Sequence, residues 1–454
     1  MRREYPPMER VRILSLKGLS RRQQAFVRVG QKEAARVWTV CRDLHQAARQ
    51  DHKPWPNRDA LQKATKGQFA LHSQSAQMVT HAFLANGDTA QQLRSQGRTD
   101  IRYPYKDKMF HPLMWPAQAM RLEGQRILLP MGRGRVSLVI PRPDWLTEKS
   151  ACKVVWNGVH NELHVTRSEP DPLPPHSAGL ETTSRHATVD LGQIHQAAVA
   201  TNDGDALIVS GRGIRSVKRQ HSQQLGEIAS KRSRCTKGPR RWRTLGRARA
   251  KLTLRQVRRV RDLRHKGTRQ VADFCKAHAV EAVFIGNPDG VRRKNCGRHH
   301  NQRMSQWEYG RDIDYLQQKS EQDRIVHCGP HGPCFTGDER GTSSRCPVCG
   351  HHHKPKGRNW RCQACGFEGH RDIVGAVNMH PIAYGQVVPF PKRITHCGPH
   401  GPYLRPGHLR RSSRPDTGHS CLTPTRNQAP QDVSLRVLRN TPTDRVYEVR
   451  CSPA

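Results

Sequence analysis

Residues 346–378 read CPVCGHHHKPKGRNWRCQACGFEGHRDIVGAVN, the stretch with the most specific residue spacing in the chain. It holds two Cys-x-x-Cys pairs, Cys346/Cys349 and Cys362/Cys365, each followed at once by a glycine. Four thiolates at this spacing can occupy the corners of a tetrahedron on two facing turns, as structural zinc requires. Two coincidental pairs or a redox dithiol are the alternatives. We expect a zinc ribbon over residues 346–366.

The segment after the ribbon predicts a short helix that carries an acidic residue. In HRDIVGAVNM, Asp372, Gly375, Ala376 and Met379 share one helix face. The small pair allows that face to approach a sheet closely, which would direct the carboxylate of Asp372 toward the sheet edge. Alternatively, this carboxylate is simply favoured by the positive end of the helix dipole. Asp372 is therefore a candidate metal ligand that needs acidic partners elsewhere in the chain.

The overall charge indicates a polyanionic partner. The 454 residues include 78 Lys+Arg against 37 Asp+Glu, a formal net charge of +41. Such an excess is typical of proteins that bind nucleic acid over much of their surface. The N-terminus has no apolar signal segment, so we expect a reducing, cytoplasmic, nucleoid-associated location in which most cysteines outside the ribbon are free.

The first part of the chain predicts helices and a small sheet. Residues 1–16 are expected to form a strand, and apolar spacing of three and four predicts amphipathic helices between residues 20 and 97. YPYKDKMFHPLMW (103–115) then leads into several short strands, which suggest a small β-barrel joined by the N-terminal strand. Aromatic residues beside Lys106 and Lys108 would suit base stacking on a nucleic acid, although core packing is the default for each.

The proline-rich segment 171–179 is the expected domain boundary. Beyond it the pattern predicts three strands, a basic helical hairpin over 213–280, a fourth strand near 281–290, a helix near 302–322 and the helix of Asp372. Asp190 lies inside the apolar run of the first strand, where a carboxylate is costly unless it is paired or bound to metal. This order matches an RNase H-like α/β sheet, in which the first strand is central and lies next to the fourth.

In such a sheet a carboxylate on the first strand meets one on the closing helix. Carboxylates this close repel each other unless divalent cations lie between them, so we expect catalytic Mg²⁺ and two-metal phosphodiester hydrolysis. The helical hairpin predicts a nucleic-acid-binding arm. Its candidate contact residues are Arg240, Arg241, Arg243, Arg247, Arg255 and Arg258.

Several motifs resemble the TnpB family and its relatives, the compact type V CRISPR effectors and the Fanzor proteins. They are VDLG at Asp190, LHSQSAQ (71–77), YPYKDKMF, the TSSRCPVCG/CQACG ribbon and HRDIVGAVN, and the resemblance covers roughly residues 1–380. It implies an RNA-guided endonuclease, whose guide RNA pairs with one strand of double-stranded DNA beside a short motif that the protein reads. A monomer is the favoured state.

The resemblance also implies an α+β multidomain architecture. Residues 1–16 and 105–175 would form a wedge β-barrel, and 17–104 a helical recognition lobe. Residues 176–345 and 367–382 would form a RuvC-like nuclease domain into which the zinc ribbon is inserted. A basic, largely disordered tail is expected over 383–454. The heptapeptide HCGPHGP occurs twice, beginning at His327 and His396, without an evident mechanism.

One position departs from the family pattern. The family usually has a glutamate at the end of the fourth strand, where this chain has Gly286. Some relatives place the glutamate just before the TS-x-x-C of the ribbon, which here is Glu339, and Glu308 is a weaker candidate. We therefore expect a relocated site of Asp190, Glu339 and Asp372. The alternatives are a guided DNA-binding protein that does not cut and a zinc-ribbon RNA-binding protein, although the latter leaves the two aspartates unexplained.

Overall fold

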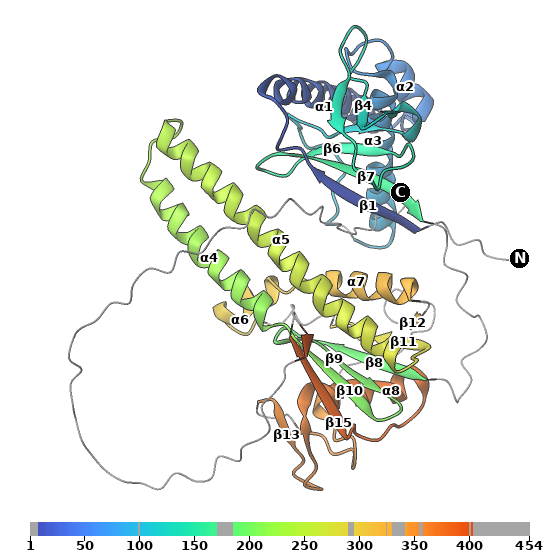
Figure 1. The fold of residues 1–454 in the computed structure, drawn as a ribbon, viewed down its shortest axis with the longest axis vertical. Helices are drawn as coiled ribbons and strands as arrows, with labels where there is room; N and C mark the ends of the chain where they lie inside the picture. Colours follow the sequence, from blue (N-terminus) through green and yellow to red (C-terminus); the bar gives the residue numbers. More distant parts are fainter. Residues whose placement is uncertain are drawn as a thin grey trace, which may run out of the picture.

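The computed structural model describes residues 8–98, 100–169, 185–288, 295–323, 325–328, 341–353, 357–398 and 401–402. These residues form an N-terminal body, a C-terminal body and a helical hairpin that extends beyond both (Figure 1). The linker predicted at 171–179, Glu339 and the tail beyond residue 402 lie outside the described residues. No helix among the described residues has the length and apolar character needed to cross a membrane.

The N-terminal body combines helices with two antiparallel sheets. One sheet has the order β1-β7-β6-β2 and the other β3-β4-β5, and no closed barrel is present among the described residues. The predicted wedge β-barrel is therefore wrong, because β1 and β2 remain the two edges of an open sheet. The elements are β1 (Met8–Ser15), α1 (Arg21–Gln50), α2 (Arg58–Thr65), α3 (Ser73–Ser95), β2 (Leu113–Trp115), η1 (Ala117–Ala119), β3 (Arg121–Glu123), β4 (Arg126–Leu129), β5 (Leu138–Pro141), β6 (Cys152–Trp156) and β7 (Asn161–Glu169).

The helices and strands of this body share one hydrophobic core. Helix α1 begins with a capping box, in which the Ser20 hydroxyl and the Gln23 side chain each bond the other's backbone N–H. Trp38 of α1 packs edge-to-face on Phe83 of α3, with ring centroids 5.1 Å apart, and the same cluster includes Trp115 of β2. The helices expected as a recognition lobe thus pack directly on the strands expected as a wedge.

The C-terminal body is built on a sheet with the order β12-β11-β8-β9-β10-β15-β16. Strand β8 lies between β11, to which it is parallel, and β9, to which it is antiparallel, so the predicted RNase H-like order is confirmed. The elements are β8 (His186–Leu191), β9 (His195–Thr201), β10 (Asp205–Ser210), α4 (Arg212–Ser233), α5 (Arg240–Ala277), β11 (Ala282–Ile285), α6 (Arg298–Ser305), α7 (Tyr309–Gln322), β12 (Val326–Cys328), η2 (Thr342–Ser344), β13 (Asn359–Arg361), β14 (Glu368–His370), α8 (Arg371–Tyr384), β15 (Arg393–Gly398) and β16 (Gly401–Pro402).

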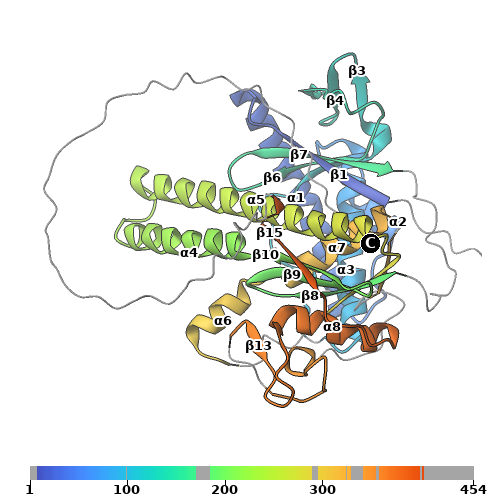
Figure 2. The same cartoon turned by 60° about the horizontal axis from the view of Figure 1, so that its bottom comes forward.

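Helices cover both faces of this sheet (Figure 2). Side chains alternate along a strand, so Ala187, Val189 and Leu191 of β8 pack against α5 and α7. The intervening residues face α8, where the Thr188 hydroxyl donates to the carbonyl of Ala376 at 2.6 Å. The same alternation places Asp190 on the α8 face of the sheet.

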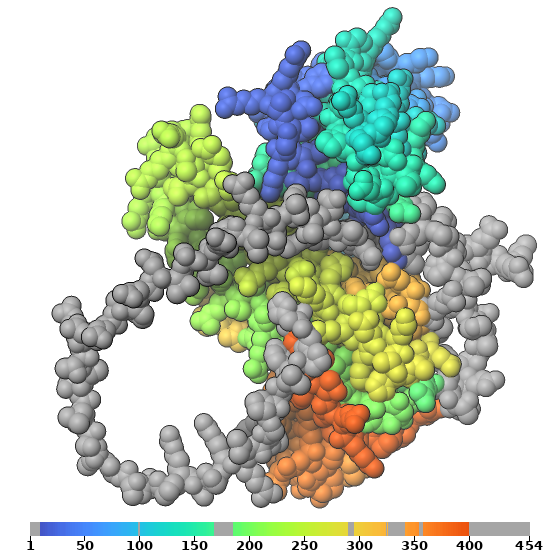
Figure 3. All heavy atoms as spheres, viewed as in Figure 1, coloured from blue at the N-terminus to red at the C-terminus, as the bar shows by residue number. Residues whose placement is uncertain are grey.

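Three features of this body bear on the sequence-based expectations. Strand β15 pairs in parallel with β10, so the predicted tail from residue 383 includes a strand of the sheet. Helices α4 and α5 form the predicted basic hairpin, whose tip stands clear of both bodies (Figures 1 and 3). Both copies of the HCGPHGP heptapeptide begin on strands of this sheet, β12 and β15.

Candidate active site

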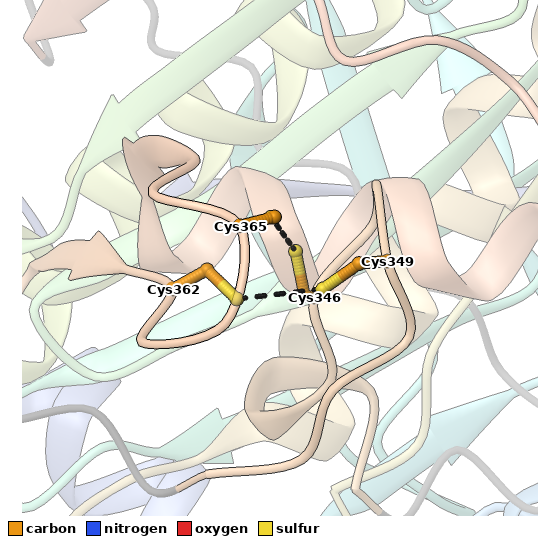
Figure 4. Close-up of side chains that lie close together, drawn as sticks. All are labelled: Cys346, Cys349, Cys362 and Cys365. Atoms are coloured by element: carbon orange, nitrogen blue, oxygen red, sulfur yellow. Dashed lines mark hydrogen bonds between the residues drawn. The ribbon is translucent and has the colours of Figure 1, made fainter.

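The four ribbon cysteines converge as the spacing predicts (Figure 4). The sulfur atoms of Cys346 and Cys365 lie 3.7 Å apart, and those of Cys349 and Cys362 lie 3.5 Å apart. Tetrahedral zinc with Zn–S bonds of about 2.3 Å requires sulfurs about 3.8 Å apart, so this donor set fits the metal. The glycine after each pair, at 350 and 366, has a positive φ that permits the tight turn.

The ribbon packs against helix α8. Trp360 is fully buried in a small cluster with Cys346 and Cys362, and Val374 of α8 completes it. The Asn378 side chain donates to the carbonyls of Thr342 and Arg345, each at 2.7 Å. These contacts fix α8 and the segment before the first ribbon cysteine as one unit.

Asp190 lies directly against α8. A Cβ atom built on Gly375 would be 2.5 Å from Asp190 Oδ2 and 3.7 Å from the Cβ of Ser343. Gly375 is therefore the position at which β8, α8 and the segment leading into the ribbon approach one another. The predicted small residue on this helix face is required, because any side chain would displace the carboxylate.

Asp372, one turn earlier on α8, has three polar neighbours. His195 at the start of β9 donates from Nδ1 to Asp372 Oδ2 at 2.6 Å, and Arg358 Nη1 lies 2.5 and 2.7 Å from the two carboxylate oxygens. The backbone N–H of Asp372 donates to His370 Nδ1 at 3.3 Å. Only 14% of the Asp372 side chain is exposed.

These neighbours determine the charge of Asp372. Burial by itself raises the pKa of this carboxyl, but the hydrogen bond from His195 and the charge of Arg358 outweigh burial, so the net pKa lies below its usual value. Burial lowers the pKa of His370 to about 4 despite the nearby Asp372. The site thus holds an ionised Asp372 beside a neutral His370. The sequence did not reveal His195 and Arg358, which come from other segments, nor His370, which lies two residues before Asp372 but has no spacing that marks it as a partner.

The position of the missing family glutamate lies beside Asp190. Ile285 of β11 pairs with Val189, and the next residue, Gly286, donates its N–H to the Val189 carbonyl at 3.0 Å. Glu308 does not join this site, because its carboxylate bonds Lys218 at 3.1 Å on the side of the sheet that α5 and α7 cover. Glu339 lies outside the described residues, so its predicted role stays a prediction.

A basic cavity of about 960 Å³ opens beside the β8–β9 turn. Burial lowers the pKa of Arg215 within it, and the charges of Arg303, Arg358 and Arg212 lower that pKa further. Such repulsion between cations favours binding of an anion. The cavity is lined by residues of the β8–β9 turn and of helices α4 to α7, including Gln193, Arg212, Arg215, Lys218, Arg219 and Arg303.

The predicted nucleic-acid-binding residues have different surroundings. On α5 the exposed ones are Arg240, Arg241, Arg243, Arg247 and Arg255. Arg258 instead bonds the buried Glu162 of β7 and so links the two bodies. Lys106 is exposed, whereas the Lys108 ammonium lies 3.0 Å from the ring centre of Trp38 and its burial lowers its pKa to about 8. Arg258 and Lys108 therefore have structural partners within the chain.

Two family models match parts of the chain. One, described as Cas12f1-like, TNB domain, matches residues 331–379, and OrfB_IS605, described as probable transposase, matches residues 165–292. Over these two regions the chain resembles the TnpB and Cas12f1-like proteins. The two matched regions contain the four ribbon cysteines, Asp190 and Asp372, so the candidate site of this TnpB-like chain lies within the matched segments.

One solved structure has a similar fold. A Cas12f1–sgRNA–target DNA complex is similar with a TM-score of 0.55 and 14% identity, covering 79% of this chain and 83% of that one. A CRISPR-Cas12f ternary complex gives a TM-score of 0.36 at 15% identity, covering 80% and 82%. No curated protein matches the chain.

Proposed function

We propose that this TnpB-like chain is an RNA-guided endonuclease that hydrolyses double-stranded DNA beside a short flanking motif. The supporting observation is that Asp190 of β8 lies against α8 at Gly375, one helical turn from Asp372. Asp190 thus lies against the same helix that carries Asp372, at one end of an RNase H-like sheet. The segment before the ribbon also approaches this point through Ser343, four residues after Glu339.

The donor set fits Mg²⁺, because Asp190, Asp372 and the predicted Glu339 all offer carboxylate oxygens. These residues would hold Mg²⁺, which would supply activation of the attacking water and stabilisation of the leaving oxygen. The hydrogen bond from His195 orients Asp372 and keeps it ionised. Arg358 balances its charge while remaining 38% exposed, so its guanidinium can also reach a phosphate.

The guide and target partners are supported by charge and by the related complex. The similar Cas12f1 structure holds sgRNA and target DNA, and this chain presents an exposed arginine row on α5 and a basic cavity beside the candidate site. Zinc at the ribbon would keep the α8 end of the site in place through the Trp360 cluster. We propose that the chain acts as a monomer with one guide RNA.

A second candidate function is guided DNA binding without cleavage. It is favoured by Gly286, which places no carboxylate beside Asp190 where the family usually has one. In this case the protein would repress by occupying its target.

Cleavage of a plasmid that matches the guide tests both proposals. Wild-type protein with Mg²⁺ should cut, leaving 5′-phosphate ends, and Asp190→Ala and Glu339→Ala should not cut. Glu148→Ala, which changes an exposed glutamate in the N-terminal body, is the matched control and should cut normally. Normal cutting by Glu339→Ala would exclude the relocated glutamate. Target binding by wild type without any cutting would establish the second function.

A further inference from the structure

The atoms nearest to Asp372 include two imidazoles as well as the arginine. Ligand atoms of His195, His370 and Asp372 all lie within 4.8 Å of one another. The three residues come from β9, from the end of β14 and from the start of α8. The ring of His396 on β15 lies 6.3 Å from that of His370. Three strands and a helix therefore direct imidazole and carboxylate groups to one place.

We propose that His195, His370 and Asp372 bind a divalent first-row transition metal such as Mn²⁺ directly, in the pocket where carboxylates alone would bind Mg²⁺. This inference rests on the proposed function only in sharing Asp372. First-row transition ions accept imidazole nitrogen, Co²⁺ and Zn²⁺ most strongly and Mn²⁺ most weakly, whereas Mg²⁺ takes oxygen ligands. Two imidazoles beside one carboxylate therefore favour a transition ion over Mg²⁺.

The local geometry supports direct coordination. Nδ1 of His370 accepts a backbone hydrogen bond, so this nitrogen carries a lone pair, and at 3.3 Å that bond is weak enough to exchange. His195 Nδ1 can bind the ion only when the imidazole carries its proton on Nε2, so metal binding replaces the hydrogen bond to Asp372. His195 Nδ1 and Asp372 Oδ2 lie 2.6 Å apart, whereas two ligands on one ion at about 2.1 Å are about 3 Å apart. A shift of a few tenths of an ångström accommodates the ion.

Arg358 competes with the metal. Its Nη1 contacts both oxygens of Asp372, so a bound cation must displace the guanidinium. The Arg358 side chain is 38% exposed, and it can therefore swing into water on its flexible stem. Removal of this charge should strengthen metal binding, whereas removal of either imidazole should weaken it.

Electron paramagnetic resonance of Mn²⁺ on the full-length, zinc-loaded protein tests the inference. Ribbon thiolates prefer zinc, so they do not take up Mn²⁺. We expect spin-echo modulation from directly bound ¹⁴N in wild type. It should be lost or halved in His195→Asn and His370→Asn, with Mn²⁺ affinity at least 10-fold lower. Arg358→Gln should bind Mn²⁺ more tightly, and His52→Asn is the control because His52 is exposed with a φ of 54°, which asparagine tolerates.

Absence of ¹⁴N coupling, or unchanged coupling in both histidine variants, would show that the imidazoles only orient Asp372 and would overturn the inference. Plasmid cleavage with Mg²⁺ and, separately, with Mn²⁺, measured on the same preparations, reports the proposed function. Cutting without ¹⁴N coupling refutes the metal preference alone, whereas ¹⁴N coupling without cutting with either ion refutes the nuclease alone.

Discussion

Gly375→Ala is the substitution that tests the arrangement of Asp190 and α8 most directly. A Cβ at this position would lie 2.5 Å from Asp190 Oδ2, whereas ordinary contact begins near 3.4 Å, so the carboxylate must retreat by about 1 Å. A displacement of this size at a reacting centre typically costs about 100-fold in rate. Overpacking costs about 1–3 kcal/mol of folding stability, which the better helix propensity of alanine offsets by about 1 kcal/mol.

We therefore expect Gly375→Ala to fold with a loss of about 0–2 kcal/mol and to cleave matched plasmid about 100-fold more slowly with Mg²⁺. Single-turnover cleavage and urea unfolding measure the two quantities. The matched control is Gly226→Ala in α4, where an added Cβ meets nothing within 4 Å, and this variant should gain about 0.5–1 kcal/mol and cut normally. Wild-type cleavage by Gly375→Ala would show that Asp190 does not act from its position against α8.

Three further predictions concern the zinc, the arm and the contact between the bodies. Cys362→Ser should release one equivalent of zinc, detected by a colorimetric chelator, and should lower the melting temperature, while Cys235→Ser outside the ribbon should change neither. Replacing Arg241, Arg247 and Arg255 together by glutamine should make RNA affinity less dependent on salt. The slope of log affinity against log salt concentration should fall by about one unit for each phosphate that no longer binds an arginine. An unchanged slope would exclude the arm from the interface. Burial alone raises the pKa of Glu162, but its hydrogen bonds, including that from Arg258, lower the net pKa to about 2. The ionised carboxylate therefore stabilises the fold fully above about pH 4.5, and this contribution disappears as the pH falls toward 2. Glu162→Gln should therefore unfold at lower urea than wild type at pH 6, and the difference should shrink by pH 3; a constant difference would mean that charge is not its cause.

The zinc ribbon and the strand order could be predicted from the sequence because their determinants are local. The four cysteines lie within a short stretch and carry their own turn glycines, and Gly350 and Gly366 adopt the expected left-handed conformation. The apolar runs around Asp190 and before Gly286 marked buried strands, and their order was enough to place the first beside the fourth.

Contacts between distant segments could not be predicted, since no spacing in the sequence encodes them. His195 and Arg358 reach Asp372 from segments 177 and 14 residues away. The strands predicted to close into a barrel form open sheets, and β15 pairs with β10 although it lies in the segment predicted as a disordered tail. Local propensity and burial patterns were sufficient to identify the four ribbon cysteines and the order of β8 to β12. The imidazole of His195 and the guanidinium of Arg358 reach Asp372 only in the folded chain, because the packing of β9 and of the segment before β13 against the start of α8 brings them together.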